Sequence, residues 1–278
     1  MEYGLIGEKL GHSYSKIIHE LLGCYSYDLY PISKDNLVDF ILSKNFKGLN
    51  VTIPYKQDVM PLCSKVSELA KEIGAVNTLY FDENNTLCGT NTDYYGFLYA
   101  INRAGINLYN KKVLILGDGA TCKTMRKAVL DSGANEIIIA SRKVTNPIFE
   151  HFKSDISISP FEMINCTTIN YDDLTAQPDV EIIINTTPVG MWPNTQSSPI
   201  DLRKFQKCSG VFDVIYNPYY TKLLTQAKEL DIPHAGGLAM LVAQATCAAE
   251  YFTGFSQDFS SENERIIEEL QKQINERL

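Results

Sequence analysis

The stretch KKVLILGDGATCKT, residues 111–124, decides the fold of the second half of this chain. Its apolar residues Val113–Leu116 form a strand pattern, which leads through Gly117, Asp118 and Gly119 into a helical pattern. A strand, a glycine turn and a helix in this order are typical of a dinucleotide phosphate loop. Gly117 permits the tight turn, Gly119 lets the backbone approach a pyrophosphate, and the amides of the following helix face the phosphates.

The match to a phosphate loop is partial. The third position of the pattern is Cys122 rather than glycine or alanine, and Asp118 puts a carboxylate near the expected pyrophosphate. An ordinary strand–helix turn also explains Gly-Asp-Gly taken alone. The strands and helices predicted on both sides favour nucleotide binding.

The end of the next strand indicates which nucleotide is bound. An NAD-preferring fold usually carries an acid about 20 residues past the loop, where it binds the ribose hydroxyls. This strand ends instead in Ala140, Ser141, Arg142 and Lys143. Two cations and a hydroxyl suit the 2′-phosphate of NADP, although a solvated basic turn has the same composition. We therefore predict NADP rather than NAD as the cofactor.

Further apolar runs follow the phosphate loop at regular intervals. They are rich in β-branched residues and apolar on both faces, which is typical of parallel strands covered by helices. The runs are Asn135–Ser141, Val180–Asn185 and Ser209–Val214. The polar segment Ser154–Gln177 between them predicts no definite element. The region 102–236 is thus expected to be a Rossmann-type doubly wound nucleotide domain.

The first hundred residues alternate short strand and helix patterns. The strand patterns are Tyr3–Ile6, Tyr25–Tyr30, Gly48–Val51 and Val76–Phe81. The helical patterns are Ser15–Leu22, Leu37–Leu42 and Val66–Ile73. This alternation predicts a three-layer α/β domain at residues 1–101 with mainly parallel strands.

Three helices are expected to link or complete these domains. The segment Asp93–Ala104 is predicted to cross from the first domain to the second. An apolar helix covers Leu238–Phe252, and a charged helix, opened by the capping box Ser261-x-x-Glu264, runs toward Leu278. We expect residues 237–278 to pack back on the first domain.

Composition restricts the class of protein. The chain has 278 residues, of which 45% are hydrophobic and 21% are charged, as is ordinary for a soluble protein of two domains. A net charge of -8 and a pI near 5.1 argue against a nucleic-acid partner. Seven cysteines without a Cys-x-x-Cys pair, no signal-peptide pattern and no long apolar run predict a cytoplasmic protein with no membrane or metal site. A monomer and a homodimer both remain open.

Two polar segments carry the candidate chemistry. NVTIPYK, residues 50–56, contains Lys56, and GTNTDYYGF, residues 89–97, contains Asp93. A lysine and a carboxylate brought together can hold and move a proton. Taken singly, Lys56 can also be interpreted as an exposed surface lysine. Thr92 or Asp93 can be interpreted as a cap of the following helix. Pro54 predicts extended chain before Lys56, and a helix is expected just after it.

Other candidate groups are weaker. The four histidines form no recognisable dyad with an acid, and the one Tyr-x-x-x-Lys spacing, Tyr30 to Lys34, is interrupted by Pro31. Gln244 is polar within an otherwise apolar helix, so its amide needs partners, either a ligand or a neighbouring loop.

Six ordered segments resemble the shikimate dehydrogenase family, and the resemblance covers essentially the whole chain. They are GHSYS at 11–15, NVTIPYK at 50–56, GAVNTL at 74–79, GTNTDYYGF at 89–97, INTTPVGM at 184–191 and GGLAMLVAQA at 236–245. The resemblance implies reversible NADPH-dependent reduction of 3-dehydroshikimate to shikimate, in the biosynthesis of chorismate and aromatic amino acids. It implies that Lys56 and Asp93 are the catalytic pair.

The resemblance also implies the remaining site residues. The substrate carboxylate is held by Ser13 and Ser15, and the ring and its hydroxyls are contacted by Thr52, Asn77, Asp93, Tyr216 and Gln244. The cofactor phosphates lie at Gly117, Asp118, Gly119, Ala120 and Thr121, and the 2′-phosphate lies at Ser141, Arg142 and Lys143. Nearer the nicotinamide or the cleft mouth are Thr187, Val214, Gly237 and Glu68.

This chain departs from the family pattern in two places, and two alternative functions stay open. Lys16 and Glu20 replace a proline and an asparagine that the family usually has, and the phosphate loop is Gly-Asp-Gly-Ala-Thr rather than Gly-Ala-Gly-Gly-Ala. The second departure bears on cofactor affinity. The alternatives are a quinate/shikimate dehydrogenase that uses NAD and a non-catalytic nucleotide-sensing paralogue. A folate-type dehydrogenase should use a Tyr-x-x-x-Lys pair, which is missing here.

Overall fold

The structure, a computed structural model, comprises two compact units. Unit 1 combines Met1–Gly96 with Leu241–Leu278, and unit 2 is Phe97–Met240. The described residues are 2–11, 13–144, 148–153, 163–177 and 179–275. His12 of the GHSYS segment and residues 154–162 of the unassigned polar segment lie outside them.

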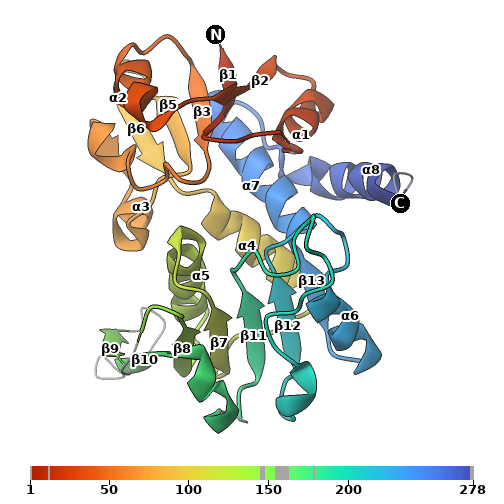
Figure 1. Cartoon of the computed structure of the whole chain (residues 1–278). Coiled ribbons are helices and arrows are strands. Elements are labelled where there is room, and N and C mark those ends of the chain that lie inside the picture. Colours follow the sequence, from red (N-terminus) through yellow and green to blue (C-terminus); the bar gives the residue numbers. More distant parts are fainter. Residues whose placement is uncertain (1, 12, 145–147, 154–162, 178, 276–278) are drawn as a thin grey trace. The chain divides into compact units, whose positions relative to one another are not determined.

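Unit 1 is built on a mixed sheet (Figure 1). Its strand order is β2-β1-β3-β5-β6-β4. The strands are β1 (Tyr3–Gly7), β2 (Tyr27–Pro31), β3 (Gly48–Val51), β4 (Lys65–Val66), β5 (Thr78–Phe81) and β6 (Leu87–Thr90). β1 runs parallel to β2 and β3, and β4 runs parallel to β6, whereas β5 is antiparallel to both of its neighbours. The α/β class is confirmed, with an antiparallel strand inserted in the sheet.

The helices of unit 1 agree with the sequence patterns to within a few residues. They are α1 (Ser15–Leu22), α2 (Lys34–Leu42), the 3₁₀ turn η1 (Met60–Leu62), α3 (Glu68–Ile73), the 3₁₀ turn η4 (Ser260–Glu262) and α8 (Asn263–Asn275). The prediction that Ser261 caps the last helix is wrong. Ser261 lies inside η4, and α8 begins only at Asn263, because a 3₁₀ turn precedes the α-helical geometry.

The long apolar helix α7 (Gly237–Phe252) returns to the first sheet. Ala248 and Phe252 are buried in one cluster with Leu5, Leu10 and Tyr27. The contact with β3 is close, because a Cβ at Gly48 would lie 2.3 Å from the ring of Phe252. The glycine thus lets the helix approach the strand backbone.

Unit 2 is a twisted, largely parallel sheet of order β13-β12-β11-β7-β8-β10-β9. Its strands are β7 (Lys112–Leu116), β8 (Glu136–Ala140), β9 (Ile148–Lys153), β10 (Met163–Ile169), β11 (Ile182–Asn185), β12 (Gly210–Asp213) and β13 (His234–Gly236). Among the described strands of unit 2, only β9 runs antiparallel to its neighbour. The helices are α5 (Ala120–Asp131) and α6 (Lys222–Glu229), with 3₁₀ turns η2 (Tyr171–Ala176) and η3 (Leu202–Lys204).

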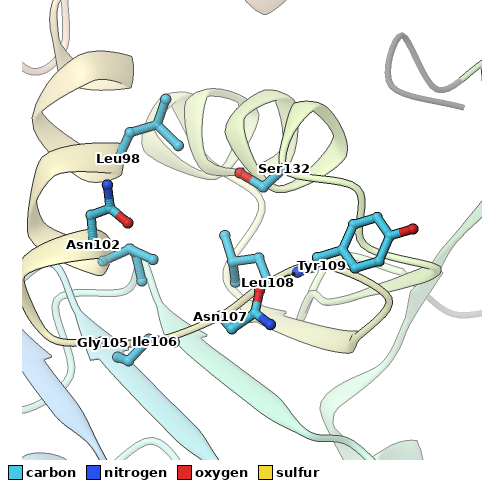
Figure 2. Close-up of a pocket in the computed structure, with 9 residues that line it drawn as sticks. Leu98, Asn102, Gly105, Ile106, Asn107, Leu108, Tyr109 and Ser132 are labelled. Carbon is cyan, nitrogen blue, oxygen red and sulfur yellow. Dashed lines mark hydrogen bonds between the residues drawn. The ribbon is translucent and has the colours of Figure 1, made fainter.

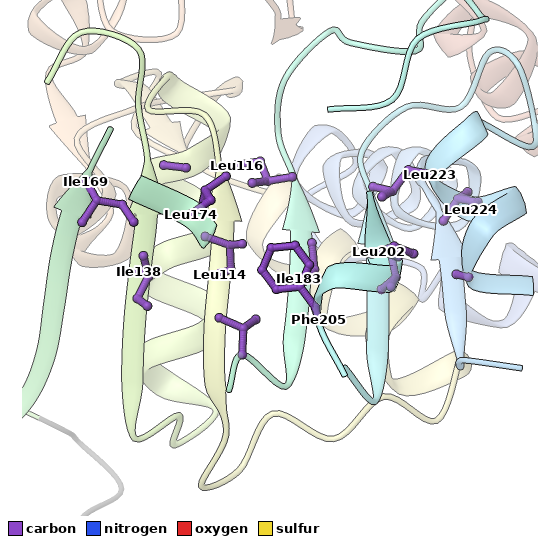
Figure 3. Close-up of a cluster of buried hydrophobic side chains, with 14 residues drawn as sticks. Leu114, Leu116, Ile138, Ile169, Leu174, Ile183, Leu202, Phe205, Leu223 and Leu224 are labelled. Carbon is purple, nitrogen blue, oxygen red and sulfur yellow. The ribbon is translucent and has the colours of Figure 1, made fainter. Parts of the chain in front are cut away.

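One face of this sheet packs on a large apolar cluster (Figure 3). The strands contribute Leu114, Ile138 and Ile183, while η3 and α6 contribute residues that include Leu202 and Leu224. Alternate residues of the same strands, such as Ile115 and Ile139, are buried as well, so the sheet is covered on both faces. This is the doubly wound architecture that the sequence predicts.

Two helices carry the chain from one unit to the other. The division falls between Gly96 and Phe97, within α4 (Asp93–Arg103), and between Met240 and Leu241, within α7. In the described part of the chain, no helix is both long and apolar enough to span a membrane.

Candidate active site

Lys56 and Asp93, which are 37 residues apart in the sequence, form a largely buried ion pair in unit 1. The Nζ atom of Lys56 donates a hydrogen bond of 2.5 Å to Oδ2 of Asp93. The two side chains are 12% and 10% exposed. Breaking a buried pair leaves a charge without its partner, so each residue holds the side chain of the other in position.

Lys56 is held by the residues around it rather than by a helix. The predicted helix after Lys56 is wrong, because turns continue from β3 as far as η1. Tyr55 is fully buried, and its hydroxyl donates to the carbonyl of Ile32. The carbonyl of Lys56 accepts the backbone N–H of Val76 at 2.8 Å. The chain is therefore anchored on both sides of the lysine.

Asp93 begins α4, and the helix start is capped by other side chains. Oδ1 of Asn91 accepts the N–H of Tyr94 at 3.4 Å. Oδ1 of Asn77 accepts the N–H of Thr92 at 2.7 Å. Asn91 therefore accepts one of the first amides of the helix, while the Asp93 carboxylate bonds to Lys56.

A buried chain of polar side chains supports this helix start. The hydroxyl of Tyr27 donates to Oδ1 of Asn50 at 2.8 Å, and Nδ2 of Asn50 donates to Oγ1 of Thr78 at 3.2 Å. The Oγ1 atom of Thr78 in turn donates to Oδ1 of Asn77 at 2.9 Å and lies 3.0 Å from Oγ1 of Thr92. Satisfied buried networks of this kind specify one arrangement of the elements they join.

Sequence reasoning assigned no role to Tyr27, Asn50 or Thr78. Asn50 and Thr78 lie in otherwise apolar strands. A polar residue at such a buried strand position needs a hydrogen-bond partner, and this could have indicated their role. Their partners lie on other strands, so the connections follow only from the pairing of β3 with β5, in which Asn50 faces Thr78.

Three of the predicted substrate residues of unit 1 lie just after β3 or at the beginning of α1, and Gln244 lies within α7. Thr52 follows β3, and its N–H bonds to the carbonyl of Ile6 at 2.9 Å, beside the end of β1. Oγ of Ser13 accepts the N–H of Ser15 at 3.2 Å, so the two serines lie together at the start of α1. Nε2 of Gln244 donates to the carbonyl of Leu241 in its own helix, not to a neighbouring loop.

In unit 2 the strand register aligns the predicted cofactor residues along one edge. Leu116 pairs with Ala140 and Asn185, and Asn185 pairs with Asp213, so these parallel strands end in a row. The residues that follow the strand ends are Gly117, Ser141, Thr186, Thr187 and Val214. The carboxyl edge of such a sheet is where α/β proteins bind ligands.

The backbone at Gly117 and Gly119 is compatible with the predicted phosphate loop. Gly117 has a φ of +99°, which strongly favours glycine, and a Cβ there would lie 2.9 Å from Oγ1 of Thr186. Gly119 precedes α5, and a Cβ there would meet nothing within 4 Å. The free space at the Cβ position of Gly119, directly before a twelve-residue helix, is compatible with a pyrophosphate near the first helix amides.

A further close contact explains Gly237. A Cβ at Gly237 would lie 2.0 Å from the carbonyl oxygen of Val214, and the N–H of Gly237 donates to the carbonyl of Ile215 at 3.0 Å. Only glycine permits this approach. Tyr216 follows in the same segment and is half-buried.

Asp213, a buried acid to which the sequence analysis assigned no role, accepts hydrogen bonds from three residues around Val214. Oδ1 of Asp213 accepts from Nδ2 of Asn185 at 3.0 Å and from the N–H of Ile215 at 3.1 Å, and Oδ2 accepts from Oγ1 of Thr221 at 2.7 Å. Burial raises the pKa of Asp213 to about 6, although these donors favour the carboxylate. The acid therefore ties the ends of β11 and β12 to the start of α6.

The residues expected at a 2′-phosphate lie next to the phosphate loop. Oγ of Ser141 donates to Oδ2 of Asp118 at 2.8 Å, and Nζ of Lys143 lies 3.7 Å from Oδ1. Arg142 is exposed beside them. Glu68 belongs to unit 1 instead, where it begins α3 and pairs with Lys71 at 2.7 Å.

A pocket of about 490 Å³ lies elsewhere in unit 2 (Figure 2). Leu98 and Asn102 of α4 line it together with Asn107 and Leu108, which precede β7, and Ser132, which follows α5. These residues lie at the amino end of β7, whereas Gly117 lies at its carboxyl end. The pocket is therefore separate from the candidate cofactor edge.

Comparison with known proteins identifies the family. The family model described as the shikimate dehydrogenase substrate binding domain matches residues 5–79. A curated relative from Clostridium perfringens (strain 13), named shikimate dehydrogenase (NADP(+)), is 38% identical over 96% of this chain and 97% of its own length.

Solved structures share the fold over nearly the full length. A chorismate mutase/shikimate 5-dehydrogenase fusion protein from Clostridium acetobutylicum has a TM-score of 0.85 at 35% identity, over 99% of this chain and 98% of its own. Quinate dehydrogenase from Corynebacterium glutamicum, in complex with NAD, has a TM-score of 0.79 at 26% identity, over 98% of this chain and 99% of its own. The ordered motifs, the two units and these relatives together establish that the chain belongs to the shikimate dehydrogenase family.

Proposed function

We propose that this chain is an NADP-dependent shikimate dehydrogenase, which reversibly reduces 3-dehydroshikimate to shikimate. The full-length similarity to a relative named shikimate dehydrogenase (NADP(+)) supports the reaction and the cofactor. The similarity to a protein fused to chorismate mutase supports a role in the biosynthesis of chorismate and aromatic amino acids.

The Lys56–Asp93 hydrogen bond is the observation that carries the proposal. In the reducing direction, Nζ of Lys56 donates a proton to the substrate oxygen as that oxygen gains negative charge. In the oxidising direction, Lys56 accepts the proton of the ring hydroxyl. Asp93 orients the ammonium group and accepts a hydrogen bond from a substrate hydroxyl. Asp93 is largely buried and lies in the first turn of α4, so its carboxylate keeps the ammonium group of Lys56 in one orientation.

Other polar groups of unit 1 are proposed to bind the rest of the substrate. Ser13 and Ser15 donate to the carboxylate, and their neighbouring positions at the start of α1 support this role. Asn77 uses its amide oxygen to hold Thr92 and Thr78, so its amide nitrogen is the group proposed for a substrate hydroxyl. Thr52, Gln244 and Tyr216 complete the proposed set of substrate contacts.

The carboxyl edge of unit 2 is proposed to hold the cofactor. The proposed phosphate contacts are the backbone of Gly117, Asp118, Gly119, Ala120 and Thr121. The 2′-phosphate is bound by Ser141, Arg142 and Lys143, and the nicotinamide end by Thr187, Val214 and Gly237. Glu68 completes the proposed set of cofactor residues. When bound, the nicotinamide supplies the hydride, and the protein supplies position and proton handling.

The domain roles and the cellular setting belong to the same proposal. Residues 1–101 with 237–278 form the substrate domain, and residues 102–236 form the NADP domain. The enzyme acts in the cytoplasm, as its seven free thiols suit, and works on small molecules without a nucleic-acid or membrane partner. Light scattering at several protein concentrations tests whether it forms a homodimer.

The test is an assay of the purified protein with shikimate or quinate, each with NADP or NAD. We expect shikimate with NADP to have the highest kcat/KM. Lys56→Ala should remove nearly all turnover while leaving nucleotide binding unchanged. Lys65→Ala is the matched control, because Lys65 forms an exposed pair with Asp82 at 2.6 Å in the same unit. Near-normal turnover by Lys56→Ala would overturn the proposed role.

One observation favours a second candidate, a quinate/shikimate dehydrogenase that uses NAD. The Asp118 carboxylate lies against Ser141, close to where an NAD-binding acid contacts the ribose. A higher kcat/KM with quinate and NAD would select this candidate. Nucleotide binding without turnover of either substrate would instead select a non-catalytic sensing paralogue.

A further inference from the structure

We propose that Asp118 is a specificity-determining residue, whose carboxylate competes with the cofactor 2′-phosphate for Ser141 and Lys143 and so lowers the preference for NADP over NAD. This inference rests on the proposed function, because it assumes that a nicotinamide dinucleotide binds at the carboxyl edge of unit 2. It assigns a role to one of the three residues at which the phosphate loop departs from the family pattern.

The position of Asp118 follows from the strand register. Leu116 and Ala140 are paired at the ends of β7 and β8. Asp118 lies two residues beyond the first strand and Ser141 one residue beyond the second, so their side chains meet across the edge. The 2.8 Å hydrogen bond and the 3.7 Å distance to Nζ of Lys143 describe this meeting. The carboxylate thus contacts two of the three residues proposed for the 2′-phosphate.

The hydrogen-bonding capacity of Ser141 makes the competition direct. A serine hydroxyl has one proton to donate. Ser141 donates that proton to Asp118, and its oxygen accepts the N–H of Lys143 at 3.1 Å. Because Ser141 is 1% exposed, its hydroxyl has few alternative partners. A phosphate oxygen can receive the Ser141 proton only after Asp118 has released it.

Charge acts in the same direction. A 2′-phosphate carries between one and two negative charges at neutral pH, so it is repelled by the neighbouring carboxylate. A free 2′-hydroxyl, as in NAD, can donate a hydrogen bond to that carboxylate. Asp118 therefore opposes the phosphorylated cofactor and assists the unphosphorylated one, while Arg142 and Lys143 retain attraction for the phosphate.

The Asp118 side chain is 35% exposed and the Lys143 side chain is 81% exposed. Solvent screens their interaction, so the pair can open without leaving a buried charge. This exposure makes exchange of the carboxylate for a phosphate feasible, and it limits the expected effect to about tenfold in the ratio of affinities.

The test measures binding of two adenosine probes, 2′,5′-ADP and 5′-AMP, to the wild-type chain and to Asp118→Asn by calorimetry. We expect Asp118→Asn to increase the affinity for 2′,5′-ADP relative to 5′-AMP by about tenfold. Asp118→Ala serves as a second variant, and thermal melting verifies that both are folded. Glu136→Gln is the matched control, since it removes one negative charge at the other end of β8 and should leave the ratio unchanged.

Further arms separate this inference from the proposed function. If the gain arises through the shared donor, adding Ser141→Ala to Asp118→Asn should remove most of it. An affinity ratio that is unchanged or lower in both Asp118 variants, with 2′,5′-ADP still bound, overturns the role of Asp118 alone. Failure of wild type and all variants to bind either probe overturns the proposed cofactor site and the inference with it.

Discussion

The two units each contain a lysine–aspartate pair, and the pairs differ in almost every physical respect. Lys56 and Asp93 of unit 1 are 2.5 Å apart and 12% and 10% exposed. Lys143 and Asp118 of unit 2 are 3.7 Å apart and 81% and 35% exposed. A buried pair cannot exchange its partner for water at low cost, whereas an exposed pair can. The first arrangement suits a fixed proton-handling pair, and the second suits a site that must yield to an incoming anion.

The surroundings of the pairs reinforce this difference. The loop that begins α4 at Asp93 is connected through Asn77, Thr78 and Asn50 to the strands of unit 1. Asp118 is held mainly across one strand edge by Ser141.

Removing the charge of the buried acid should have the largest effect. We expect Asp93→Asn to lower kcat by about a thousandfold, or about 4 kcal/mol, because the proton-handling lysine loses its orienting carboxylate. Steady-state kinetics with shikimate and NADP measure the change. Asp82→Asn, which removes the charge of the half-buried partner of Lys65, is the control and should have little effect on kcat.

The double variant Lys56→Ala with Asp93→Asn sharpens the first prediction. Losses of activity from residues that act as one unit are not additive. The kcat of the double variant should therefore be only slightly lower than that of the less active single variant. Retention of more than a tenth of kcat by Asp93→Asn, or fully additive losses, would contradict a coupled pair.

The second prediction concerns acid stability. His19 of α1 is fully buried, stacks on Tyr27 at 3.8 Å and has its pKa lowered to about 3 by burial. The unfolded chain binds a proton near pH 6.5 and the folded chain does not, so stability falls as the pH decreases from 6.5 toward 3. We expect a loss of about 3 kcal/mol in the free energy of unfolding between pH 7 and pH 4 from this residue.

Urea unfolding at both pH values, followed by circular dichroism, measures the acid effect. His19→Leu should show a smaller loss between pH 7 and pH 4 than wild type. His234→Gln, which removes a half-buried histidine of unit 2, should keep the wild-type loss. Equal losses in wild type and His19→Leu would exclude His19 as the cause.

The third prediction addresses the network behind the buried pair. Thr78→Val keeps the side-chain shape but removes the hydroxyl that joins Asn50 to Asn77 and Thr92. Leaving buried polar groups without partners should reduce the free energy of unfolding by about 2 kcal/mol. Thr225→Val is the control, because the Thr225 hydroxyl bonds to a carbonyl one turn earlier in α6, that of Thr221. Equal changes in melting temperature would argue against a special role for the network.

The smallest effect is expected on the exposed side of the comparison. Lys143→Ala should weaken binding of 2′,5′-ADP by about two- to fivefold and leave the melting temperature unchanged. Calorimetry at low and high salt measures both the loss and its screening. A large fall in the melting temperature would mean that the Lys143–Asp118 pair supports the fold and is not an exchangeable surface contact.

Local patterns predicted the regular elements of the molecule well where burial is continuous. The apolar runs that became β7, β8, β11 and β12 were found within a residue or two of their ends, because strands covered on both faces need such runs. The short strands β4 and β6 were missed. They contain Lys65 and the sequence Cys88-Gly89-Thr90, and their pairing with each other and with β5 determines their conformation.

The candidate site could be predicted only in part for the same reason. Lys56 and Asp93 were found as motif residues, but Asn50, Thr78 and Asp213 were not, since each is recognised by partners on another strand. The two wrong predictions, a helix after Lys56 and a cap at Ser261, both arose from local signals that turns and a 3₁₀ turn overrode.

The strand–glycine–helix order of residues 112–131, the α/β class and the family follow from residue types at fixed local spacings, so the sequence is sufficient to predict them. The contacts of Lys56 with Asp93 and of Asp118 with Ser141 arise only in the folded chain. Side-chain hydrogen bonds over such separations depend on which strands pair and in what register. That register is set by contacts throughout each unit rather than by any one segment.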